Sequence, residues 1–151
     1  MQTLTDDAVQ AILERLKNLQ PETPALWGKM NAHQMICHLT DAYRLAVESK
    51  PASEDITFLN RTLIRWVALH TNLKWPQGVP TRPEMDQFTG GTRPGEFARD
   101  KAALAAIIQT FAAQAGSARF PRHPIFGTLT PWEWQRWGYL HADHHFRQFA
   151  L

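Results

Sequence analysis

A chain of 151 residues with 44% hydrophobic and 20% charged side chains has the size and composition of a folded domain with its own core. Its 16 Lys and Arg nearly balance 14 Asp and Glu, so charge gives no reason to expect nucleic acid or an anionic membrane as a partner. The single cysteine excludes an internal disulfide, and no apolar run approaches the roughly 20 residues that span a bilayer. We therefore expect one cytoplasmic domain over residues 1–151.

The first half of the chain predicts two amphipathic helices. In residues 5–19, apolar side chains recur at intervals of three and four, which is the helical period. The second helix follows Asn31, a good N-cap, with Gln34 in the capping-box position three residues later. It is expected to end near residue 47, before a proline.

The middle of the chain predicts two further helices, at residues 55–70 and 96–115, separated by a long loop. The first of them carries Leu59, Leu63 and Trp66 on one side, and we expect this side to form a homodimer interface. Residues 71–95 are rich in Pro and Gly, and a loop of this length usually serves a purpose in a compact domain. We expect it to cover a pocket.

The last predicted helix spans residues 131–149. Thr130 is its N-cap, Pro131 takes the first helical position, and Glu133 completes a capping box. No segment shows the alternation of a strand, so the fold class is all-α. Four long helices, a shorter one and a long connection predict a four-helix bundle with a crossover.

Three of the seven histidines lie in the stretch HADHHFRQF of this last helix. His141 and His145 are four residues apart, so their rings share one helix face and can bind one divalent ion. His144, three residues from His141, could replace His145 in the pair. A third ligand is usual, and a residue of a facing helix is required, which favours His38 of the second helix. The candidates for the third ligand are His33, His38, His70 and His123.

Two other interpretations of these residues stay open at this point. Helical histidines at such spacing are often structural. Cys37 follows His33 by four residues, which would also fit a Cys–His nucleophile, although a lone cysteine beside Ile36 is more often a small buried hydrophobic residue.

The segments MICHLTDAYRLA and HADHHFRQF, in this order of helices, resemble the DinB-like (DinB/YfiT-type) metalloenzyme family, and HPIFGTLTPWEW resembles an uncharacterised branch of it. The resemblance implies an up-down-down-up four-helix bundle whose long crossover carries an extra short helix. It implies one divalent ion, zinc or nickel, held by His38, His141 and His145, with His144 outside the ligand set. It also implies transfer or isomerisation reactions that use a low-molecular-weight thiol.

An ion held by three neutral imidazoles keeps an open position, where it can deprotonate a thiol or a water molecule. The expectation is a metal-dependent S-transferase or isomerase acting on a small molecule. The alternatives are a metal-dependent hydrolase and a non-enzymatic, stress-related metal-binding protein. Hydrogen bonds to the ligands are expected from Asp41, Tyr43, Asp143 and Gln148. Pocket walls are expected from His144, Trp134 and Trp137, and a cation for a substrate carboxylate from Arg44, Arg136 or Arg147.

Overall fold

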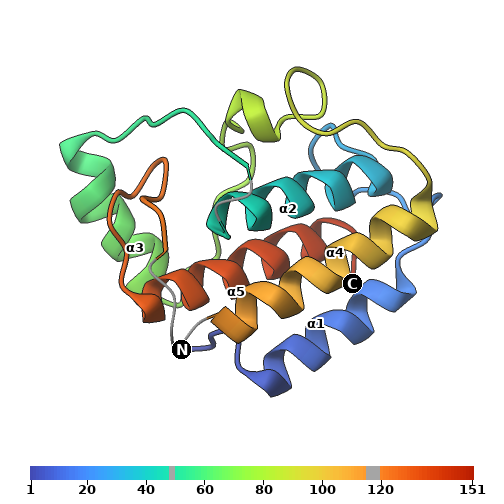
Figure 1. Ribbon diagram of the computed structural model, residues 1–151, viewed down its shortest axis with the longest axis horizontal. Coiled ribbons are helices and arrows are strands. Elements are labelled where there is room, and N and C mark those ends of the chain that lie inside the picture. The colour runs from blue at the N-terminus through green and yellow to red at the C-terminus, as the bar shows by residue number, and fades with distance from the viewer. Residues whose placement is uncertain (48–49, 115–119) are drawn as a thin grey trace.

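The computed structural model describes residues 1–47, 50–114 and 120–151, and in these residues it contains helices and no strand (Figure 1). The fold class is therefore all-α, as predicted. The elements are the helices α1 (Asp6–Asn18) and α2 (Ala32–Ala46), the π-helical turn η1 (Asn60–Ile64) with α3 (Arg65–His70), the 3-10 turn η2 (Pro83–Met85), α4 (Phe97–Gln114) and α5 (Pro131–Gln148).

Two capping boxes fix where α2 and α5 begin. The side chain of Asn31 accepts from the backbone N–H of Gln34, and the side chain of Gln34 accepts from the N–H of Asn31. Thr130 and Glu133 form the same reciprocal pair at α5. Both boxes satisfy N–H groups that a helix start leaves unpaired, so the predicted starts are confirmed.

The third predicted helix begins later than residue 55, and the prediction of its start was wrong. Residues 51–57 are not helical, because the hydroxyl of Thr57 accepts from the N–H of Asn60 and caps the helix there. The backbone N–H of Asp55 is bonded instead to the carbonyl of Pro124. The π-helical turn η1 separates this cap from α3.

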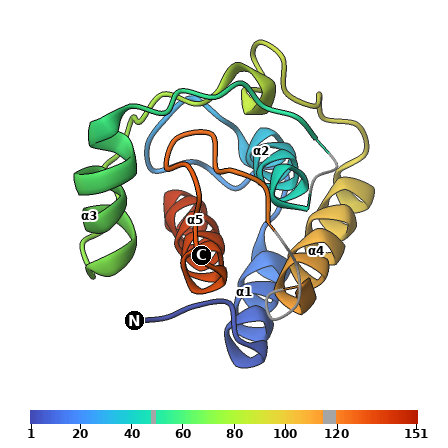
Figure 2. The ribbon, with the colours of Figure 1, turned by 60° about the vertical axis from the view of Figure 1, so that its left-hand side comes forward.

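The helices pack in pairs around a common core. α2 packs against α4 and α5, α1 packs against the same two helices, and α3 packs against α5. Figure 2 shows α5 between α3 on one side and α1 and α4 on the other. The largest buried side chains are Leu4, Ile12, Leu19, Met35, Ile36, Leu39, Tyr43, Leu69, Phe111, Trp134, Phe146 and Phe149.

Gly138 allows α5 to approach its neighbours closely. A Cβ at this position would lie 2.6 Å from the Phe111 ring and 2.7 Å from a methyl group of Leu4, which is closer than real contacts allow. The hydroxyl of Tyr43 donates to the carbonyl oxygen of Gly138 at 2.7 Å, so α2 is also bonded to α5 here. This contact brings the middle of α2 next to the face of α5 that carries His141.

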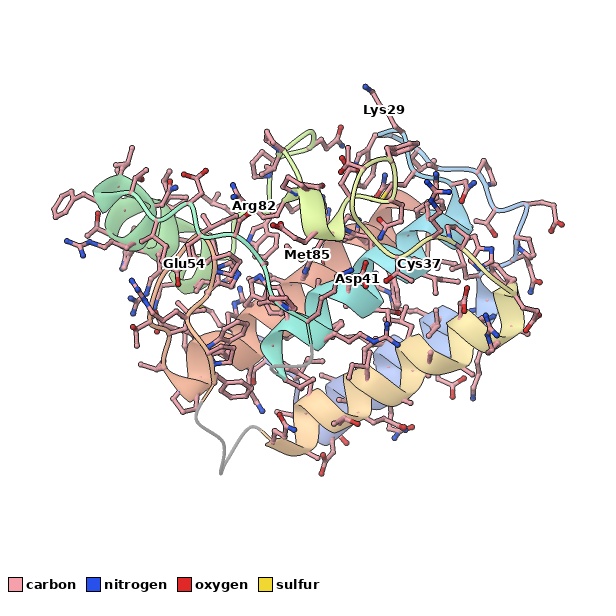
Figure 3. The ribbon with its side chains drawn as sticks, turned by 45° about the horizontal axis from the view of Figure 1, so that its top comes forward. Lys29, Cys37, Asp41, Glu54, Arg82 and Met85 are labelled. Atoms are coloured by element: carbon pink, nitrogen blue, oxygen red, sulfur yellow. The ribbon has the colours of Figure 1, made fainter. Side chains whose placement is uncertain are left out.

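The loop between α3 and α4 is tied to α2 by the buried carboxylate of Asp41. This carboxylate accepts from the backbone N–H and the hydroxyl of Thr92, both at 2.7 Å, and from the amide of Gln87 at 3.2 Å. Lys50 forms an ion pair with it at 2.7 Å. The loop, including η2, is thereby held against α2, as Figure 3 shows for Asp41 and Met85. No helix in the described part of the chain is long and apolar enough to cross a membrane.

Candidate metal centre

His38, His141 and His145 meet between α2 and α5. Nε2 of His38 lies 3.1 Å from Nε2 of His141, and the ring centroids of His38 and His145 are 4.6 Å apart. One nitrogen from each of the three rings lies within 4.8 Å of the other two. The spacing of the pair on α5 puts its rings on one face, and the packing of α2 brings the third ring to that face.

The tautomer of His38 is fixed by a backbone carbonyl. Nδ1 of His38 lies 2.8 Å from the carbonyl oxygen of Met85 in η2. Since a carbonyl oxygen can only accept, Nδ1 carries the proton, and Nε2 of the neutral ring presents a lone pair towards His141. This arrangement orients a metal-ligating imidazole in the usual way.

The tautomer of His145 is fixed by a chain of two hydrogen bonds. The side-chain NH₂ of Gln148 donates to the carbonyl oxygen of Trp27 at 2.7 Å, so the amide oxygen of Gln148 faces the other way. That oxygen lies 2.9 Å from Nδ1 of His145, which therefore carries the proton. Nε2 of His145 is left with a lone pair, like Nε2 of His38.

Burial keeps all three imidazoles neutral. Burial lowers the pKa of His38, and burial together with the neighbouring imidazoles lowers the pKa values of His141 and His145 well below 6.5. Nδ1 of His141 is buried and has no hydrogen-bond partner among the described residues. Because only a neutral imidazole binds a metal, and because the three rings bring one nitrogen each within 4.8 Å of one another, the three residues fit a divalent ion.

Aromatic rings close most of the space around the histidines. The ring centroid of Trp137 lies 5.0 Å from that of His141. The ring centroid of Trp75, in the α3–α4 loop, lies 6.0 Å from that of His141. His144 contacts Trp27 and Trp75. Of the three clustered histidines, His141 is the most exposed, so access from solvent runs past this residue.

The family whose description is "Protein of unknown function (DUF1569)" matches residues 1–151. The chain belongs to this family. No curated protein and no solved structure matches it.

The other candidate ligands from the sequence are bonded elsewhere. Nε2 of His33 lies 2.9 Å from the carboxylate of Asp100, and Nε2 of His70 lies 3.0 Å from that of Glu133. Nδ1 of His123 accepts from two backbone N–H groups that follow it in the chain, so this ring orders a turn. Burial lowers the pKa of His123 to about 3, so it stays neutral.

Several residues expected to support the ligands have other roles. Asp41 was expected near His38 because it is three residues away, but both of its carboxylate oxygens bind the α3–α4 loop and Lys50. Asp143 pairs with Arg15 and Arg147, and Tyr43 donates to a backbone carbonyl. Trp134 packs with Phe120 and Phe111 in the core and does not wall the cluster.

Gln148, His144 and Trp137 do lie against the cluster, whereas the basic residues expected to bind a carboxylate are already engaged. Arg136 is buried and donates to the carbonyl oxygens of Gln2, Leu69 and Thr71. Arg147 binds Asp143 at 2.8 Å.

The contribution of Met85 was missed because a backbone carbonyl has no sequence signature. Trp75 was one of six tryptophans in the chain, and only its place in the Pro/Gly-rich loop could have singled it out.

Cys37 points away from the three histidines, towards α4. Its Sγ lies 3.9 Å from a carboxylate oxygen of Asp100. Burial and this carboxylate raise the pKa of the thiol to about 11, so the sulfur is protonated at neutral pH. His33 is bonded to the same carboxylate, and this geometry does not favour a Cys–His nucleophile.

Proposed function

We propose that the protein is a metal-dependent enzyme in which His38, His141 and His145 hold one divalent ion, zinc or nickel. The observation that carries this proposal is the pair of fixed tautomers. The Met85 carbonyl and the Gln148 amide oxygen each accept the Nδ1 proton of one ring, so Nε2 of His38 and Nε2 of His145 both carry lone pairs, in rings whose centroids are 4.6 Å apart. Fixed acceptors that leave both Nε2 atoms unprotonated are what a metal site requires of its ligands.

We also propose that the fold is the DinB-like bundle. In this arrangement α1, α2, α4 and α5 are the four bundle helices in up-down-down-up order, and η1 with α3 is the extra helix of the crossover. The packing of α2 and of α1 against both α4 and α5 supports this assignment. So does the origin of the three histidines, which come from the second and the last of the four helices.

The reaction we propose is transfer or isomerisation with an external low-molecular-weight thiol. A divalent ion with three imidazole ligands supplies an open position and lowers the pKa of a thiol or water bound there. The chain's part is to hold His38 and His145 in the ligating tautomer and to exclude bulk water with Trp75 and Trp137. The chain's own thiol, Cys37, faces α4 and does not take part.

A small-molecule substrate has a candidate place beside the cluster. Trp75 lines a surface pocket of about 370 Å³, together with Tyr139, Asp143 and Arg147. The ring of Trp75 also lies against His141. Trp75 thus borders both the pocket and His141, and we propose that it controls access between them. Its indole N–H donates to the carbonyl oxygen of Ala68 at 3.0 Å, so movement of the ring would have to break this bond.

A second candidate is a metal-binding protein without turnover. The enclosure of the three rings by Trp75, Trp137 and the Met85 turn favours it, because a sealed ion has no place for a substrate. Metal-dependent hydrolysis is a third outcome that the same assays separate.

The test uses cobalt-substituted protein carrying Cys37→Ala, so that no thiol of the chain can bind the ion. Addition of glutathione should produce a thiolate-to-cobalt charge-transfer band, and turnover of generic electrophiles should require both metal and thiol. Trp75→Ala should alter the rate of thiol entry. If no thiol changes the spectrum and esters or amides are cleaved, the protein is a hydrolase. If neither assay responds, we conclude that the protein binds metal without catalysing a reaction.

A further inference from the structure

A second group of metal-ligating side chains lies on the other side of α2. His33 and Cys37 are four residues apart and share one face of this helix. Asp100, in the first turn of α4, points its carboxylate between them. One nitrogen, one sulfur and one oxygen of these residues lie within 4.8 Å of one another.

The distances suit a tetrahedral ion. Ligand atoms of a tetrahedral zinc site with sulfur, nitrogen and oxygen ligands are about 3.3–3.7 Å apart, given the usual bond lengths. Here Nε2 of His33 lies 2.9 Å and Sγ of Cys37 lies 3.9 Å from the same oxygen of Asp100. Small side-chain rotations would therefore place all three around one ion. The His33 ring would bind through Nε2 with its proton moved to Nδ1 by exchange with solvent.

The surroundings hold these three residues in place and leave an entrance. The N–H of Gly95 donates to the Asp100 carboxylate at 2.8 Å, and the ring of Phe97 packs edge-on against His33. Cys37 is only 3% exposed, whereas the side chains of His33 and Asp100 are each 19% exposed. An ion can thus enter at the His33–Asp100 edge, and water can complete its coordination.

We propose that His33, Cys37 and Asp100 bind a second divalent ion of the zinc class, which joins α2 to the start of α4. The Cys37 thiol is protonated in the metal-free protein, and the ion displaces this proton to solvent when the sulfur binds. Thiolate, imidazole and carboxylate form a ligand set that zinc and cobalt accept and that magnesium and calcium do not favour.

The two sites are independent. Cys37 and His38 are adjacent, so their side chains leave α2 about 100° apart. One faces α4 and the other faces α5. Loss of either ion therefore leaves the ligands of the other intact.

The experiment is a cobalt titration of the full chain, purified without an affinity tag and stripped with a chelator. We expect two equivalents of cobalt per chain and a thiolate-to-cobalt charge-transfer band without any added thiol. Cys37→Ala should lose the band and one equivalent, and His33→Ala should also lose one equivalent. The control His70→Ala removes another histidine that is bonded to a carboxylate, and it should keep both equivalents.

The result that overturns this proposal does not depend on any variant. A wild-type protein that binds cobalt without a thiolate band has no ion at Cys37, and His33–Asp100 is then only a hydrogen bond that stabilises the start of α4. Retention of two equivalents by Cys37→Ala would place the second ion elsewhere and also reject the site. His145→Ala tests the three-histidine site separately. It should lose one equivalent of cobalt and keep the thiolate band, so failure of the Cys37 site can be told from failure of the three-histidine site. Far-ultraviolet circular dichroism checks that each variant is folded.

Discussion

Nδ1 of His38 donates to the carbonyl oxygen of Met85 across 2.8 Å, which connects the middle of α2 to a turn of the α3–α4 loop. Further along the same loop, Thr92 donates to the carboxylate of Asp41, which lies about one helical turn after His38 in α2. The loop therefore has a defined role, since its anchor on Asp41 places the carbonyl that fixes the tautomer of His38.

The first prediction concerns the three ligands. In a Cys37→Ala background, where only the three-histidine site is counted, the protein should hold about one zinc or nickel ion per chain. His38→Ala, His141→Ala and His145→Ala should each abolish tight binding because two imidazoles rarely hold an ion alone. His144→Ala and His70→Ala are the controls and should retain it. If metal analysis finds that His144→Ala loses the ion and His145→Ala keeps it, the third ligand is His144 and our choice of His145 is wrong.

The second prediction concerns Gln148. Gln148→Leu removes the acceptor for Nδ1 of His145, so the ring is no longer held in the ligating tautomer. Metal affinity should fall about 10- to 100-fold. The control is Gln135→Leu, the same substitution on α5 at a position six residues before His141. It should leave metal affinity unchanged. Competition with a chromophoric chelator measures both variants, and equal affinities would show that Gln148 does not orient His145.

The third prediction concerns the anchor of the loop. Asp41→Ala removes a fully buried carboxylate that makes four polar contacts with Thr92, Gln87 and Lys50, and should lower the free energy of unfolding by about 3 kcal/mol. Metal affinity should fall as well, because the Met85 carbonyl loses its position. Asp55→Ala, which breaks an ion pair with Arg82 in which the carboxylate is 63% exposed, should change neither quantity appreciably. Urea unfolding and metal competition are the measurements. If Asp41→Ala is less stable but binds metal normally, the loop does not control the site.

The fourth prediction concerns acid. Burial alone would raise the pKa of Glu133, but hydrogen bonds from Arg65, His70 and Thr130 outweigh it and lower the pKa to about 2. Because the pKa of this carboxyl is lower in the folded state, its stabilisation is present above pH 4.5 and is lost as the pH falls towards 2.

The contribution amounts to about 3 kcal/mol at neutral pH. The difference in unfolding free energy between wild type and Glu133→Gln should therefore shrink steadily between pH 4.5 and 2. A difference that stays constant over this range would mean that the carboxylate is not selectively stabilised in the folded protein.

The fifth prediction concerns assembly. Leu59, Leu63 and Trp66, the side of the third predicted helix that was expected to form an interface, are 52%, 58% and 57% exposed. We propose that this apolar face forms a homodimer. Leu63→Glu should shift the protein to a 17.3 kDa monomer in sedimentation velocity at micromolar concentration. Val79→Glu is the matched control, since Val79 is also 58% exposed and belongs to the α3–α4 loop rather than to this helix. If the wild-type protein sediments as a monomer, the homodimer prediction is wrong.

The sequence by itself determined the local features of this protein. Helix starts followed from the capping boxes at Asn31 and Thr130, because capping is a contact between residues three apart. The spacing of His141 and His145 was enough to put both rings on one face, because helix geometry depends on the separation in the chain alone.

The tertiary structure decided what those local features contact. Asp41 has the right spacing to support His38, yet it binds Thr92, because the packing of the loop against α2 offers a closer donor. The acceptor for His38 is a backbone carbonyl, a group that every residue carries, so no side-chain pattern could identify Met85. Asp100 meets His33 and Cys37 only because α4 packs against α2. Contacts between residues more than 40 positions apart depend on how helices and loops pack, and packing is set by the whole core rather than by any one segment.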